Sequence, residues 1–188
     1  TLTITGTLRF SNLNWTYTAG TVAATASTIM VTTASTFDSA GMDFGVIYFL
    51  SAATHTLNSL LTTNTLTVDA NVVFTGTFGW YTQIFNLGVT ANTGRTITLE
   101  DLNTYTVISY FNSIRSTNTL RAILQSSDAV NMAIFTCGPG CVMNVGYTNA
   151  IRIDSSLGKQ VYSFNGVYTT AINWSNTFPV TVAYAFQN

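Results

Sequence analysis

Charged side chains are scarce in this chain. They make up 7% of its 188 residues, whereas they make up about 25% of an ordinary soluble domain. The six Lys and Arg residues lie singly along the sequence, and the formal net charge is −1. The chain therefore offers no basic patch that could neutralise a run of phosphates, and we do not expect nucleic acid as a partner.

Long apolar runs are also missing, although 47% of the residues are hydrophobic. Thr, Asn or Ser interrupts every apolar run well before the ~18 residues that a membrane-spanning helix needs. We therefore predict no membrane span and assign the apolar residues to a core. The sequence starts with Thr1 inside an alternating stretch, without a basic segment followed by an apolar one. We expect it to be a segment or a processed part of a longer chain.

Histidine and cysteine are too rare to build the common metal sites. The chain has one histidine, His55, and two cysteines, Cys137 and Cys141. One histidine excludes multi-histidine sites, and two thiols without a histidine close by in the sequence do not make a zinc site. Asp154 begins an Asp-Ser-Ser stretch that faintly resembles a calcium loop, but Asp and Ser in turns more often bond their own backbone. We predict no metal and no other cofactor.

Catalytic motifs are absent as well. The chain has no Gly-x-Ser-x-Gly elbow, and we expect His55 at the surface or beside a strand. Two pairs of carboxylates are close in sequence: Asp38 with Asp43, and Glu100 with Asp101. Glycoside hydrolysis needs two carboxyl groups ~5–9 Å apart across a cleft, and adjacent strand residues such as Glu100 and Asp101 would point to opposite faces. We interpret all four as solvated turn acids and predict that the protein is not an enzyme.

Neutral polar residues take the place of the missing charges. The chain contains 35 Thr and 17 Asn. Thr is β-branched and favours strands, and helix formers in helix-period runs are largely missing. Apolar and polar residues alternate with a period of two, which predicts half-buried strands of five to seven residues. The alternation is clearest at 1–10, 65–72, 97–99, 120–124 and 180–186, and it directs a set of aliphatic side chains inward: Leu2, Ile4, Leu66, Val68, Ile97, Leu99, Leu120 and Leu124.

Turn signals set the architecture that we expect. Gly and Asn punctuate the chain at intervals of roughly 20 to 30 residues, the range of stacked repeats. Asn165-Gly166 is the one tight-hairpin signal. Stacked units of roughly 25 residues would let Thr and Asn at matching positions bond their neighbours ~4.8 Å away, while aliphatic side chains stack inside. We predict a single all-β domain over residues 1–188, a parallel β-solenoid (β-helix) of about seven units, with an antiparallel β-sandwich or jelly roll as the alternative.

The two cysteines lie on either side of Gly138-Pro139-Gly140, residue types that reverse a chain. A tight turn there would bring Cys137 and Cys141 within reach of a disulfide. A disulfide and two free buried thiols are both open, and two thiols do not identify the compartment.

The stretch from Arg95 to Trp174 combines Thr-rich strands with Gly, Asn and Ser turns. Its characteristic residues are Thr96-Ile97-Thr98-Leu99, Leu120 to Leu124 with Ser126-Ser127, Pro139-Gly140, Val145-Gly146-Tyr147, Ile153-Asp154-Ser155-Ser156, and Tyr162 to Gly166 ahead of Asn173-Trp174. This stretch, nearly half of the chain, resembles the Thr-rich β-helical repeat segments of marine phage tail fibre and other virion structural proteins, and of large bacterial surface proteins. The resemblance implies a structural role in a virion or at a cell surface, with homo-oligomers, first of all a trimer, and no catalytic residues.

The function that we expect is a structural module of a phage fibre, spike or similar surface appendage that faces the host. The alternatives are an adhesin domain that binds cell-surface carbohydrate, a polysaccharide-degrading spike, and a jelly-roll capsid or decoration protein. Aromatic residues make up 13% of the chain, and exposed Trp or Tyr rings can stack on sugars. If the chain binds a glycan, Trp80 and Tyr81 are the expected contact.

Overall fold

The computed structural model describes residues 1–11, 13–90, 93–113, 116–117 and 119–177, and of residue 13 only the backbone. Within this part of the chain every helix-or-strand element is a strand, so the all-β prediction is confirmed. The strand expected at 180–186 lies outside the described residues.

The strands form two large sheets and one small one. The first sheet contains β1 (Leu2–Phe10), β3 (Val22–Val31), β5 (Asp43–Phe49), β7 (Leu61–Val68), β9 (Trp80–Leu87), β11 (Thr104–Ser113), β13 (Ala133–Cys137), β14 (Val142–Val145) and β16 (Ile153–Asp154). The second contains β2 (Leu13–Thr16), β4 (Ser35–Asp38), β6 (Ala53–Leu57), β8 (Val72–Gly76), β10 (Thr96–Leu99), β12 (Ala122–Ser126), β15 (Thr148–Ile151) and β18 (Tyr168–Thr169). The third pairs β17 (Val161–Tyr162) with β19 (Trp174–Ser175).

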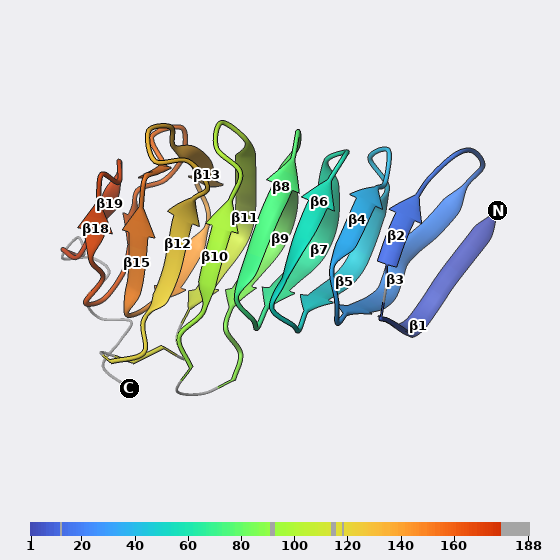
Figure 1. Ribbon diagram of the computed structural model, residues 1–188, viewed down its shortest axis with the longest axis horizontal. Coiled ribbons are helices and arrows are strands. Elements are labelled where there is room, and N and C mark those ends of the chain that lie inside the picture. The colour runs from blue at the N-terminus through green and yellow to red at the C-terminus, as the bar shows by residue number, and fades with distance from the viewer. Residues whose placement is uncertain (12, 91–92, 114–115, 118, 178–188) are drawn as a thin grey trace.

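From β1 to β13 the chain alternates strictly between the two large sheets, as Figure 1 shows from the N-terminal end onward. We call one first-sheet strand with the second-sheet strand that follows it a unit. Every strand pairing among the described residues is parallel. A strand thus bonds to the strand one unit away and not to its neighbour in sequence, and successive connections do not form hairpins. The antiparallel sandwich or jelly roll is therefore wrong for the described chain.

Asn165-Gly166, the expected hairpin signal, lies in a turn that does not form a hairpin. Asn165 has a φ of 54°, in the left-handed region that Asn tolerates. The amide of Gly166 donates to the carbonyl of Ser163 at 3.3 Å, which closes a turn between β17 and β18. These two strands lie in different sheets, so the turn redirects the chain instead of pairing its flanks.

The units are shorter near the N-terminus than the ~25 residues expected. Ile47 pairs with Leu66 and Leu66 with Phe85, at an even and short spacing, whereas Phe85 pairs with the more distant Phe111. The connections from the first to the second sheet explain the difference. They span only 50–52 and 69–71 in the short units, whereas those from β9 to β10 and from β11 to β12 are longer. The first sheet has eight strands in its hydrogen-bonded row, against the seven units expected.

The prediction that alternate strand residues point into the core is confirmed for the middle of the chain. Leu66, Val68, Ile97, Leu99 and Leu124 are fully buried, and Ile4 is 8% exposed. Two of the expected core residues are exposed. Leu2 is 56% exposed because β1 is the outermost strand of its sheet and has a neighbour on one side. Leu120 is 47% exposed because it ends a turn, where its amide donates to Thr117 Oγ1, ahead of β12.

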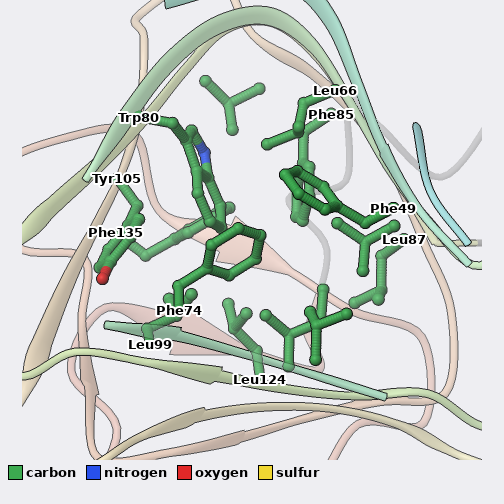
Figure 2. Close-up of a cluster of buried hydrophobic side chains, with 14 of the residues drawn as sticks. Phe49, Leu66, Phe74, Trp80, Phe85, Leu87, Leu99, Tyr105, Leu124 and Phe135 are labelled. Carbon is green, nitrogen blue, oxygen red and sulfur yellow. The ribbon is translucent and has the colours of Figure 1, made fainter. Parts of the chain in front are cut away.

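Aromatic rings from both sheets fill the core in a continuous series (Figure 2). The ring of Phe74 in β8 lies edge-on to Phe49 in β5 at 5.1 Å and to Trp80 in β9 at 4.9 Å. Phe85 stacks on Phe111 one unit further at 5.4 Å. Edge-to-face and offset ring pairs stabilise a core beyond the area that they bury, by about 0.5–1.5 kcal/mol each. The core therefore links the two sheets and also links successive units.

A ladder of amides runs along the outer face of the first sheet, as expected for matching positions in stacked units. Asn112 Nδ2 donates to Asn86 Oδ1 at 2.9 Å, and Asn144 Nδ2 donates to Asn112 Oδ1 at 3.1 Å. Asn86 Nδ2 in turn donates to Thr67 Oγ1 at 3.2 Å. Neutral side chains thus satisfy one another along the surface, in place of water or ions.

Candidate functional site

Trp80 and Tyr81 point to opposite faces of β9, because successive strand residues alternate. Trp80 is fully buried among Phe74, Phe85 and Tyr105 (Figure 2), so it is not available as a glycan contact and that part of the expectation is wrong. Tyr81 is 37% exposed on the outer face of the first sheet. Of the two expected contact residues, only Tyr81 can meet a ligand from solvent.

Tyr81 lies at a hollow of about 270 Å³ on this outer face. We call it the β5–β9 hollow; its lining residues are Thr25, Asp43, Phe44, Thr62, Thr63, Asn64, Tyr81 and Gln83. The parallel register places Asp43, Thr62 and Tyr81 side by side on β5, β7 and β9. Equivalent positions of three successive units thus supply one continuous line of side chains.

Two buried threonines shape the strands beside the hollow. The single hydroxyl hydrogen of Thr63 is shared between the carbonyls of Gly45, 2.9 Å from Oγ1, and of Thr65, 3.1 Å from it. One unit on, Thr82 Oγ1 donates to the carbonyl of Ile84 at 2.9 Å. These hydroxyls satisfy carbonyls inside the sheet, where an unbonded one would be costly. They also hold the backbone on either side of Asn64 and Gln83, whose side chains line the hollow.

Gly45 is required where β3 and β5 meet next to the hollow. A Cβ at this position would lie 2.4 Å from the carbonyl oxygen of Ser27 and 2.6 Å from that of Thr25. The backbones of the two strands therefore approach more closely than any other residue would allow. This contact brings Thr25 up to the hollow as one of its lining residues.

The hollow offers hydrogen-bonding groups and one aromatic ring but no pair of catalytic acids. Asp43 is its single carboxylate, and Asp38, the expected partner, lies in β4 of the second sheet and does not line it. The lining adds two amides from Asn64 and Gln83, and threonine hydroxyls. Such a set can bind and orient a polar ligand, but it lacks the second acid that glycoside hydrolysis needs.

Glu100 and Asp101 do not follow the expectation that they point apart. Both lie in the turn after β10 and not in a strand, so the strand alternation does not apply to them. Ser127 Oγ lies 3.4 Å from Glu100 Oε1 and 3.3 Å from Asp101 Oδ1. The pKa of Glu100 is raised by burial, by a hydrogen bond with Asp101 and by the charge of Asp101. The two carboxyls form a surface pair held by Ser127, and neither of them lines the β5–β9 hollow.

His55 lies inside the core, so the expectation of a surface position is wrong. It alternates with Thr54 and Thr56 in β6 and therefore turns inward, where its ring lies 4.3 Å from that of Phe49 and 5.7 Å from that of Phe74. Burial lowers the pKa of His55 to about 4. Its Nδ1 shares a 2.7 Å hydrogen bond with Ser35 Oγ, and its Nε2 has no partner among the described residues.

Asp154 bonds its own turn, as expected. Its Oδ1 accepts a hydrogen bond from the amide of Ser156 at 2.8 Å, which is a local Asx turn. Among the described residues, no three His, Cys, Asp or Glu side chains come together in a way that could hold a metal ion.

Cys137 and Cys141 are both buried and both free. They flank the short loop between β13 and β14, two half-strands that pair with the same strand, β11. Cys137 pairs with Val107, and Val142, the residue after Cys141, pairs with Tyr110 of the same strand. A hydrogen bond between the thiols, with burial, raises the pKa of Cys137, and the same hydrogen bond lowers that of Cys141.

Oxidised glutathione is expected to convert Cys137 and Cys141 into one intrachain disulfide. Closing so short a loop should stabilise the fold by about 2 kcal/mol, seen as a higher urea midpoint. Intact mass under non-reducing conditions, with alkylation of any remaining thiol, measures the bond. The double variant Cys137→Ser/Cys141→Ser is the control and should not respond to the oxidant. Persistent mixed disulfides with glutathione, or disulfide-linked dimers, would contradict the pairing.

Sequence reasoning missed Asn64 and Gln83, and it did not place Asp43 in a ligand-sized hollow. A signal was present, because Asp43, Thr62 and Tyr81 are evenly spaced in the sequence, at the offset of the units in this part of the chain. The longer unit that the turn signals indicate does not align these three positions.

Comparison with known proteins gives no significant match. No protein-family model matches the chain, and no curated protein and no solved structure is significantly similar to it. Within the described residues, no helix has the length and apolar character needed to cross a membrane.

Proposed function

We propose that the chain is a parallel β-solenoid and that it acts as a stiff structural module of a phage fibre, spike or comparable surface appendage, without catalysis. The observation that carries this proposal is the pairing pattern: each described strand bonds in parallel to the strand one unit away, and one core passes through all the units. In such stacks each unit contacts only its neighbours, so the structure grows along one axis.

Three contacts between units support stiffness along that axis. Backbone hydrogen bonds of both sheets join each unit to the next. The aromatic series of the core crosses unit boundaries, for example from Phe85 to Phe111. The amide ladder of Asn86, Asn112 and Asn144 joins three units on the outside. Bending the stack would strain all three sets of contacts at once.

The surface supports a role in a larger assembly. Only 7% of the residues are charged, so few like charges would oppose the association of copies through these neutral faces. We propose homo-oligomers, with a trimer first, on a virion or at a cell surface.

Small-angle scattering and electron microscopy of the purified chain test the architecture. We expect elongated particles whose long axis is the stacking direction, and light scattering that gives a multiple of the 20.3 kDa chain mass. Antibodies against the chain test the role and should label appendages of intact virions or cells. Scattering that does not fit stacks of parallel strands, alone or side by side in an oligomer, would overturn the solenoid, and label found only after lysis would overturn the surface role.

A further inference from the structure

We infer that the β5–β9 hollow binds a neutral glycan, with the ring of Tyr81 stacked on a sugar and the side chains of Asp43 and Asn64 bonded to its hydroxyls. This inference goes beyond the structural role proposed above and does not depend on it. It rests on the geometry of the hollow and on the lack of hydrogen-bond partners for the side chains of Asp43 and Asn64 among the described residues.

Two polar side chains of the hollow, those of Asp43 and Asn64, are free to bind a ligand. The side chains of Asp43 and Asn64 have no hydrogen-bond partner in the part of the chain that the structure describes. By contrast, Asn86 and Asn112, on the same face, bond to each other in the amide ladder. Asp43 and Asn64 thus remain available at the hollow, whereas Gln83 Oε1 already accepts a hydrogen bond from Ser109 Oγ at 3.0 Å.

The shape favours part of a polymer over a small, enclosed ligand. The hollow measures about 270 Å³, below the roughly 300–1,000 Å³ of pockets that enclose small molecules. It lies open on β5, β7 and β9, and its line of side chains follows the stacking direction from Asp43 through Thr62 to Tyr81. A sugar chain lying along that direction would meet each of these strands in turn.

The chemistry matches a sugar and not a nucleotide or an acidic glycan. A sugar ring has an apolar face that stacks on Tyr, and hydroxyls that donate to a carboxylate and accept from amides. The lining contains no Lys or Arg to meet a phosphate, a sialic acid or a uronic acid. Asp43 would instead repel such a group at short range. We therefore assign a neutral glycan built of hexoses or N-acetylhexosamines.

A printed panel of oligosaccharides tests the inference with the whole chain. The panel holds neutral hexose and N-acetylhexosamine oligomers, each beside a version that carries sialic or uronic acid. We expect binding to at least one neutral oligomer and much weaker binding to its acidic version. Tyr81→Ala should weaken that binding roughly tenfold, the effect of one lost stacking contact. Asp43→Asn should reduce the discrimination against the acidic version.

Tyr110→Ala is the matched control. Tyr110 lies on the neighbouring strand β11 and is 45% exposed, close to the 37% of Tyr81, but it does not line the β5–β9 hollow. Its loss should leave binding unchanged, and circular dichroism shows whether each variant is folded. The inference is overturned if no neutral oligomer binds, if Tyr81→Ala binds as well as the parent chain, or if Tyr110→Ala weakens binding to the same extent.

Discussion

Gly76→Ala is expected to destabilise the protein by about 3–5 kcal/mol. Gly76 ends β8 with a φ of +107°, a conformation that L residues rarely adopt. A Cβ there would lie 2.3 Å from the carbonyl oxygen of Leu57, the residue with which Gly76 pairs in β6. Backbone atoms of a paired strand cannot move aside as a flexible side chain can, so the clash adds to the backbone strain. Urea unfolding followed by circular dichroism measures the loss.

Gly20→Ala separates the two causes. Gly20 has nearly the same φ, +108°, but a Cβ at that position has no atom within 4 Å. Gly20→Ala should therefore destabilise the protein through backbone strain alone, by about 1–3 kcal/mol. If both variants lose the same stability, close packing of β8 on β6 contributes nothing and the explanation for Gly76 is wrong.

The secondary structure was predictable because alternation is a local signal. Leu66, Val68, Ile97 and Leu99 alternate with polar residues within one strand, so their burial required no knowledge of distant contacts. Leu2 shows the limit of that signal. It follows the same pattern but is exposed, since burial also depends on a strand lying on either side.

The length of the units was not predictable from the turn signals. Gly and Asn occur at turns, but the short connection at 50–52 contains neither, and the one at 69–71 contains no Gly, so both are easily missed between strands. The turn signals therefore indicate a longer unit than the structure has. This error hides the alignment of Asp43, Thr62 and Tyr81, and with it most of the hollow.

Residue types were a poor guide to the site. Tryptophan next to tyrosine suggested one joint sugar contact at Trp80 and Tyr81, although two consecutive strand residues cannot share a face. The same rule does not hold for Glu100 and Asp101, because they lie in a turn. Whether two consecutive residues lie in a strand or in a turn therefore decides whether their side chains point apart or come together.

Sequence reasoning places His55 at the surface or beside a strand because no catalytic motif surrounds it, yet the core accommodates its ring with one hydrogen bond. Its Nδ1 is bonded to Ser35 Oγ at 2.7 Å, and its ring fits between Phe49 and Phe74. This arrangement holds only for the neutral ring. An imidazolium there would lie in an apolar environment with no carboxylate among these contacts, and for that reason burial lowers the pKa to about 4 from 6.5.

The buried His55 is expected to make the protein sensitive to acid between about pH 6.5 and pH 4. In this range the unfolded chain binds a proton at His55 and the folded chain does not, so the contribution of His55 to stability falls as the pH is lowered and levels off below pH 4. A shift of this size corresponds to about 3 kcal/mol. Urea unfolding at a series of pH values measures it against the double variant Ser35→Ala/His55→Phe, which removes the titrating ring without leaving Ser35 Oγ unbonded. Groups such as Glu100 titrate in both proteins, so their contribution to the free energy of unfolding cancels in the difference between the two curves. If that difference does not change between pH 7 and pH 4, His55 is not held neutral in the core.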